Sequence, residues 1–215
     1  MIRRLSAALV AFVFTVSPIV WAQDLAPIKL PAPQTDGGKP LMQALKARQS
    51  ARDYSAEKMP LQVVSNLLWA AWGINRPDGH RTAPSASNKQ EVDVYVTLPD
   101  GAYVYDAKAN ALNPVAAGDL RGATGTQPFP ATAALNLVYV ADTSKVARPA
   151  TDPQQALNLG ADVGFVAANV YLYCASEGLA TVVRASIDKP ALAKALKLRD
   201  TQLIVLAQSV GYPKK

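Results

Sequence analysis

The feature that most constrains the fold is a long apolar segment, residues 158–177, followed directly by Gly178. Apolar side chains occupy almost every face of the helix that this segment would form, which is typical of a helix packed on both sides. A glycine at this point is the common end of a helix, because glycine readily adopts the left-handed conformation needed there. We therefore expect a long helix buried against a sheet and against a second neighbour.

The segments around this helix alternate between helical and strand patterns. Helical spacing is found at residues 40–46, 60–72 and 189–196, and Gly73 ends the second of these. Apolar or alternating runs predict strands at residues 92–96, 102–105, 135–140, 179–184 and 202–210. Residues 106–130 have a mixed pattern that includes a glycine-rich loop at 121–126. The order indicates a mixture of α and β elements.

The first 22 residues have the pattern of a signal peptide. Two arginines precede an apolar run at residues 5–20, and a cleavage site follows at Ala22. We expect a mature chain that begins at Gln23 and is periplasmic or secreted, without a stable membrane anchor. An uncleaved anchor is the alternative, but the run is shorter than the roughly 20 residues of a bilayer span and contains Pro18. The paired arginines leave the twin-arginine export route open.

Two regions follow the signal peptide. Residues 23–39 contain three prolines and the pair Gly37-Gly38, and predict an extended arm, rather than a packed element, that could wrap a neighbouring chain. Residues 40–215 are long enough for one domain with a sizeable core. The single cysteine, Cys174, lies within the long apolar helix and is expected in the core. Because no internal disulfide is possible, an exported chain must be held together by packing or dimerisation.

Several functional classes are excluded by composition. The formal charge is +6 and falls to about +4 without the two arginines of the signal peptide, which is too small a surplus to indicate nucleic-acid binding. His80 is the only histidine, so neither a Ser-His-Asp triad nor a metal site is expected. The spacing of Gly122 and Gly125 fits neither a P-loop nor a dinucleotide fingerprint.

Four polar clusters interrupt the apolar pattern and are the candidates for a site. The first, Arg48, Ser50 and Arg52, places two guanidinium groups and a hydroxyl close together, a donor set suited to a phosphate. The others are the small-residue loop 81–90, Gln127 with Phe129, and Lys214 with Lys215. Taken singly, such clusters are more often a solvated helix end, a surface turn, a loop and a frayed tail.

In this order the clusters resemble motifs of the FMN-dependent nitroreductase family, and more closely those of its branch that oxidises thiazoline and oxazoline rings of modified peptides. The resemblance covers residues 40–215 and rests on four motifs: Arg48-Gln49-Ser50-Ala51-Arg52, Arg81-Thr82-Ala83-Pro84-Ser85-Ala86, Gly164 to Leu172 with Asn169 followed by Gly178-Leu179, and Val210-Gly211-Tyr212-Pro213. It implies an α+β nitroreductase-like fold, in which helices flank a central mixed, mainly antiparallel sheet, and an intertwined homodimer.

The resemblance also implies that FMN is held across the dimer interface. Arg48 would contact its phosphate, aided by Lys214 or Lys215, while Ser50 and Arg52, flanking Gln49, would contact the ribityl chain and the pyrimidine edge. The partner chain would supply a loop; its residues are Pro84, Ser85, Ala86 and Asn88. Gln127 would face the pyrimidine, and the backbone at Ala185 or Ser186 would lie near the flavin N5 atom.

The implied function is an exported FMN oxidoreductase that transfers hydride or electrons through N5 to or from a small organic substrate. The electron donor or acceptor is open, because nicotinamide donors are cytoplasmic. Phe129 and Arg184 are candidates to face the substrate, with a core aromatic and a solvated arginine as the alternatives. Two other functions are a non-catalytic flavin- or ligand-binding module and an enzyme that cleaves flavin.

The chain departs from the family pattern at three places. Ala185 stands where glycine is common, the loop continues as 87–91 without the Gly and Tyr-Pro of the peptide-ring oxidases, and the basic tail is reduced to two lysines. The resemblance therefore specifies the cofactor more closely than the substrate.

Overall fold

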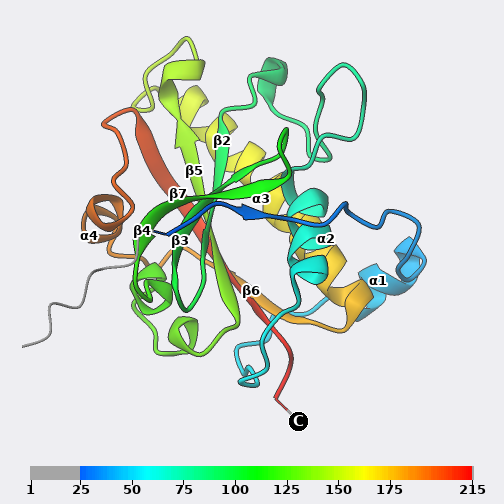
Figure 1. Ribbon diagram of the computed structural model, residues 1–215. Helices are drawn as coiled ribbons and strands as arrows, with labels where there is room; N and C mark the ends of the chain where they lie inside the picture. Colours follow the sequence, from blue (N-terminus) through cyan, green and yellow to red (C-terminus); the bar gives the residue numbers. More distant parts are fainter. Residues whose placement is uncertain (1–24, 215) are drawn as a thin grey trace, which may run out of the picture.

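A computed structural model describes residues 25–214 (Figure 1). The predicted signal peptide, the expected first mature residue Gln23 and Lys215 lie outside the described residues. Seven strands of this part of the chain form one sheet in the order β1-β4-β3-β2-β5-β7-β6. Every pair in it is antiparallel, so no parallel pair contributes among the described residues. The strands are β1 (Ile28–Lys29), β2 (Val92–Thr97), β3 (Gly101–Asp106), β4 (Ala111–Ala117), β5 (Leu135–Asp142), β6 (Ala180–Arg184) and β7 (Gln202–Gly211).

Helices cover both faces of the sheet, as Figure 1 shows for α2 and α4. Side chains of the central strand β5 alternate between the two faces: Leu137 and Tyr139 pack with α2 and α3, whereas Val138 and Val140 pack with α4. All eight residues of β5 are buried for this reason. The helices are α1 (Leu41–Ala47), α2 (Leu61–Trp72), α3 (Pro153–Glu177) and α4 (Lys189–Ala195).

The long helix α3 begins five residues before its predicted start. Asp152 caps it by accepting a hydrogen bond from the backbone of Gln155, and Pro153 occupies the first turn. Gly178 ends it in the left-handed conformation, with φ of 71°, as expected. Cys174 is buried in the core, also as expected.

Only one side of α3 is buried in the single chain. Its inner face packs on α2 and the sheet, whereas Leu157 and Phe165 on the opposite face are 65% and 46% exposed. The sheet and α2 are thus the two neighbours that the apolar pattern of this helix predicted, and the outer face of α3 stays uncovered in the single chain. The neighbouring helix α1 adds three exposed apolar side chains to the same region: Leu41, Met42 and Leu45.

Two expectations from the sequence are wrong. The arm is packed on its own chain, because β1 pairs with β4 and Leu30 is buried. The strand β4 was not expected, since Asn113 and Pro114 interrupt its apolar pattern. Pro114 is accommodated because it lies next to a bulge at Val115 of β4 and beyond the two-residue pairing with β1, and proline in a sheet is confined to such positions.

Candidate functional site

The first polar cluster is fastened to the outer edge of β6. The backbone nitrogen of Ala51 donates to the carbonyl of Thr181 at 2.9 Å. Tyr171 of α3 lies against the same edge, and its hydroxyl accepts a hydrogen bond from the Val183 nitrogen at 2.9 Å. The hydroxyl of Ser50 is also 2.9 Å from that of Tyr171. Tyr171 therefore joins the helix, the strand edge and the cluster.

The two arginines of this cluster have no anionic partner. Arg48 lies over the ring of Tyr171, 5.4 Å from its centroid, and both Arg48 and Arg52 are exposed. Within residues 25–214 neither guanidinium pairs with a carboxylate or donates a hydrogen bond. Their donors are available to an external anion, and a phosphate matches the planar geometry of a guanidinium.

The C-terminal segment lies beside the first cluster. Tyr54 pairs with Pro213 in a single antiparallel bridge, and the Lys214 nitrogen donates to the carbonyl of Asp53 at 3.3 Å. The side chain of Lys214 is exposed. Its backbone contact, Asp53, is the residue that follows Arg52. Lys215 lies outside the described residues, so its expected role stays a prediction.

The C-terminal end of β6 brings together the three residues of this chain that were expected near the flavin ring: Gln127, Ala185 and Ser186. The Thr126 nitrogen donates to the carbonyl of Ser186 at 3.0 Å, which places Gln127 beside the turn at Ala185 and Ser186. All three of these residues are exposed. From Thr181 to Ser186 the strand edge and its turn extend over roughly 16 Å. An elongated ligand with a phosphate at one end could lie along this edge.

The expectation that Arg184 faces a substrate is wrong, and so is its alternative of a solvated arginine. The Arg184 side chain is buried at 7% exposure and donates four hydrogen bonds within the protein. These go to the carbonyl and hydroxyl of Thr124, to Asn136 and to Ser209. Burial lowers the pKa of Arg184 to about 10. Its guanidinium ties β6 to the 124–125 loop and is not free for a ligand.

Phe129 takes part in this same internal packing. Its ring lies 5.6 Å below the Arg184 guanidinium and 6.4 Å from the ring of Tyr54. It is only partly buried and packs against a small core cluster with Tyr54 and Ala133. The alternative of a core aromatic describes this position better than a substrate-facing one.

The close packing at Arg184 gives a first prediction. A side chain on Gly125 would collide with the Arg184 guanidinium and lie 3.1 Å from Pro130. We expect Gly125→Ala to lower the free energy of unfolding by about 1–3 kcal/mol, as overpacking does. Gly122→Ala is the matched control, since its new methyl group would make an ordinary 3.5 Å contact. Equal stability of the two variants in urea unfolding would contradict this packing.

The second loop lies elsewhere in the chain. The Ala86 nitrogen donates to Asp162 of α3 at 2.8 Å, so Pro84, Ser85 and Ala86 are held near the first half of the helix. Asp162 precedes Tyr171 by nine residues, which is about 13 Å along the helix axis. One chain therefore does not bring this loop, with Asn88, to the residues at the β6 edge.

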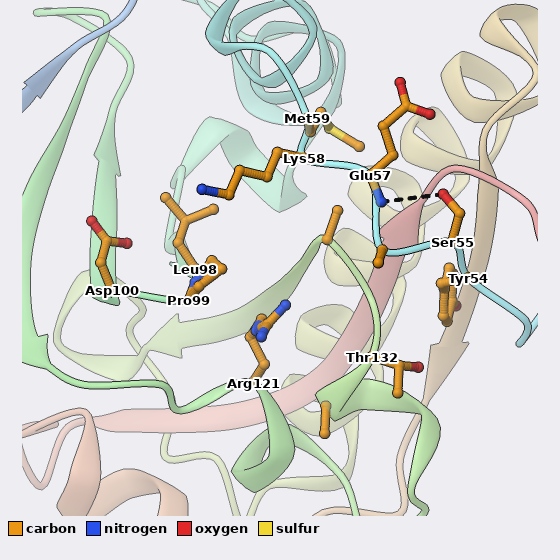
Figure 2. A pocket seen from close by; sticks show the side chains of 13 residues that line it. Tyr54, Ser55, Glu57, Lys58, Met59, Leu98, Pro99, Asp100, Arg121 and Thr132 are labelled. Carbon is orange, nitrogen blue, oxygen red and sulfur yellow. Dashed lines mark hydrogen bonds between the residues drawn. The ribbon is translucent and has the colours of Figure 1, made fainter.

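Cavities lie both at and away from these residues. A small cavity of about 210 Å³ lies beside the first cluster, between Gln49, Tyr171 and Thr181. A cavity of about 720 Å³ opens between the loop 54–59 and the β2–β3 turn (Figure 2). None of the expected flavin contacts lines it. Arg121 there pairs with Asp119 at 2.7 Å, so its charge is already neutralised.

No group of three or more metal-ligating side chains lies together in residues 25–214. None of the helices in this part of the chain combines the length and apolar character that a membrane span requires.

Sequence reasoning missed two residues of the site. Tyr171 and Asp162 both lie in α3, and each holds a different polar segment. The available signal was a polar group within an otherwise apolar helix, since such a group needs a partner when buried. Which partner it finds depends on the tertiary fold.

Comparison with known proteins identifies the class of this fold and site. Residues 45–212 match the profile of the nitroreductase family. A crystal structure of a nitroreductase-like protein from Ralstonia eutropha JMP134 is 40% identical, with a TM-score of 0.82 over 88% of this chain and 90% of that one. The chain therefore belongs to the nitroreductase family.

Two more distant structures share the fold. A nitroreductase-like protein from Desulfovibrio desulfuricans in complex with FMN is 20% identical, with a TM-score of 0.61 over 83% of this chain and 89% of that one. A chain of the E. coli microcin synthetase complex is 18% identical, with a TM-score of 0.67 over 95% of this chain and 85% of that one. The fold predicted from the sequence motifs is confirmed.

Proposed function

We propose that the mature protein is an exported, homodimeric oxidoreductase that binds FMN along the outer edge of β6. The observation that carries this proposal is the pair of unpartnered guanidinium groups, Arg48 and Arg52, beside a strand edge that Tyr171 and Ser50 line. An anion is the natural partner of such a pair. Membership of a family with an FMN-bound neighbour supports FMN as that anion.

Each part of FMN would have donors along this edge. Arg48, with Lys214 nearby, would hold the phosphate, whereas Ser50 and Arg52 would hold the ribityl chain and the pyrimidine edge. At the far end Gln127 and the backbone at Ala185 and Ser186 would approach the ring. When bound, FMN would supply hydride transfer at its N5 atom, so the protein itself needs no nucleophile. These residues bind and orient the cofactor and leave one ring face to the substrate.

A second copy of the chain would complete the site. The loop with Pro84, Ser85, Ala86 and Asn88 lies about 13 Å away along α3 and would reach the flavin of the partner. The exposed apolar face of α3 and α1 supports a dimer, since contiguous apolar surface of this kind marks interaction sites. Two chains packed through this face would also cover the exposed Leu157 and Phe165 side chains of α3.

This dimer gives a second prediction. Phe165→Asp places a charge in the middle of the exposed face of α3, and we expect the dimer dissociation constant to rise about 30-fold or more, as for loss of an aromatic anchor. Sedimentation equilibrium measures it. Leu203→Asp is the control, because Leu203 is 39% exposed on β7 and lies off this face. Unchanged dimerisation of Phe165→Asp would remove α3 from the interface.

The function itself is tested on purified mature protein. We expect a yellow protein whose flavin absorbance is bleached by dithionite and restored by an added acceptor. Flavin that binds but turns over with no acceptor would instead indicate a binding module, and a flavin fragment formed after reduction in air would indicate a flavin-cleaving enzyme. A colourless protein without affinity for FMN would contradict the proposal as a whole.

A further inference from the structure

A buried glutamate lies directly before β2 without any hydrogen-bond partner. Glu91 is 1% exposed, and neither of its carboxylate oxygens has a partner among the described residues. An isolated buried carboxylate is costly, so such a group is normally paired or protonated. Glu91 therefore requires an explanation that the β6 edge does not give.

The group that faces Glu91 is a second buried carboxyl, that of Asp162. Asp162 is 4% exposed, comes from α3, lines the same small cavity as Glu91, and contributes to the raised pKa of Glu91. The same Asp162 accepts the hydrogen bond from the Ala86 nitrogen at 2.8 Å. Two carboxyls in contact favour a state in which they share one proton. Protonated Glu91 can donate to Asp162 while Asp162 still accepts from Ala86.

Among residues 25–214, no neighbouring lysine or arginine pairs with Glu91 and so stabilises its ionised form. Lys89 and Arg148 line the cavity of about 240 Å³ beside the pair, but neither donates to Glu91. The Lys145 amine is engaged by Asp93 at 3.1 Å and by the carbonyl of Gln90. Arg148 pairs with Asp152. Burial, followed by the contact with Asp162, raises the pKa of Glu91 to about 7.

The loop held by Asp162 is conformationally strained. Ser87, Asn88 and Gln90 have φ of 51°, 50° and 48°, a region that side chains other than glycine rarely adopt. Such a conformation persists only where surrounding contacts impose it. Besides the bond to Asp162, the Gln90 nitrogen donates to the Ser85 hydroxyl. Arg81 and the carbonyl of Gly79 hold the Gln90 side chain as well, so the bond from Ala86 to Asp162 is the contact that ties the loop to α3.

We infer that Glu91 carries a proton that it shares with the Asp162 carboxylate through a hydrogen bond, and that this shared proton holds the loop 84–88 in the position from which it contacts the flavin of the partner chain. The pair thus consists of positioning residues, not catalytic ones. Only the effect on flavin binding rests on the proposed function. The proton on Glu91 and the restraint of the loop can both be measured in flavin-free protein. Above neutral pH, two adjacent negative charges repel and the loop loses its restraint.

The first test follows the loop in flavin-free protein. Hydrogen exchange of the segment 84–90, corrected for the intrinsic pH dependence of exchange, is measured from pH 5.5 to 8.5. Because the pKa of Glu91 is raised, the protonated pair and its protection are expected below pH 7 and are lost as pH rises through 7. Protection that is constant over this range would overturn the inference, whatever the protein binds.

A neutral variant separates the shared proton from simple packing. In Glu91→Gln the amide donates to Asp162 at every pH, so we expect constant protection of the loop from pH 5.5 to 8.5. Glu57→Gln, at an exposed glutamate, is the control and should retain the wild-type profile. Asp162→Asn gives the same test if Glu91→Gln does not fold, because it also removes the second charge. A wild-type pH profile in either buried variant would contradict the shared proton.

The second readout is FMN affinity of the wild-type dimer. We expect it to fall about tenfold between pH 6 and pH 8.5, the change that one pKa unit of linkage produces, and to stay constant in Glu91→Gln. An affinity that falls equally in both proteins would overturn the coupling to the flavin. Absence of FMN binding at any pH would refute the proposed function, while the exchange profile would still decide on the shared proton.

Discussion

Replacing Arg184 by alanine is expected to lower the free energy of unfolding by about 2–4 kcal/mol. The substitution leaves a cavity and removes four hydrogen bonds, so that buried groups of Thr124 and Ser209 lose the arginine donor and Asn136 keeps only the hydroxyl of Ser209. It also releases the link between β6 and the loop next to Gln127. Urea unfolding, monitored by circular dichroism, measures the change.

Two further variants define the cause of this loss. Arg148→Ala should change stability by no more than about 0.5 kcal/mol, because its pairing with Asp152 is largely exposed. Arg184→Met fills most of the space and removes the cost of burying a charge, so we expect a smaller loss than with alanine. A wild-type stability of Arg184→Ala would mean that the guanidinium does not contribute to the core.

Replacing Arg48 by alanine is expected to weaken FMN binding by about 10- to 150-fold, equivalent to about 1.5–3 kcal/mol for a charge-assisted contact to a phosphate. Fold stability should hardly change, because Arg48 is exposed and its recorded contact is with the ring of Tyr171. Fluorescence titration of flavin-free protein with FMN measures the affinity.

The control for this variant is Lys108→Ala. Lys108 is exposed in the β3–β4 turn, toward the opposite edge of the sheet from β6, and its loss changes the net charge equally. FMN affinity should be unchanged in this control. An equal, small loss in both variants would indicate a general effect of charge, and unchanged affinity in Arg48→Ala would remove Arg48 from the site. Riboflavin lacks the phosphate of FMN. If riboflavin binds more weakly than FMN, and with equal affinity to the wild type and to Arg48→Ala, then Arg48 contacts the phosphate.

Elements with strong local signals were predictable from the sequence. The periodicity around Val166 and Val170 and the terminal Gly178 placed α3, and the apolar run at Leu135 placed β5. The strand β4 was not predicted because Pro114 interrupts its pattern, and the bulge beside it, at Val115, depends on the pairing with β3. Local periodicity indicates which side chains of one helix or strand share a face. Which strands pair with each other depends on segments far apart in the sequence.

The candidate site also contains residues that local sequence reveals and residues whose role depends on distant contacts. Arg48, Ser50 and Arg52 were found because they lie within one short segment. The roles of Arg184 and Tyr171 were missed because their partners come from far along the chain: Arg184 bonds to Thr124 and Asn136, 60 and 48 residues away. Charge alone suggested that Arg184 would be exposed. Its burial became predictable only once the polar groups that surround it were placed by the fold.

The central claim is that each FMN site combines the β6 edge of one chain with the loop 84–88 of its partner. Mixing two defective variants tests it directly. Arg48→Ala removes the phosphate contact, and Asn88→Gly removes a loop side chain while tolerating the positive φ at that position. The two proteins are unfolded together, refolded as a mixture and titrated with FMN.

A site shared between chains predicts that the mixture regains tight binding. In a mixed dimer one site carries both substitutions and the other carries neither, so about one quarter of all sites should bind FMN with wild-type affinity. Each variant refolded alone should show none. If the mixture binds no better than the separate variants, each site lies within a single chain and the two-chain account is contradicted.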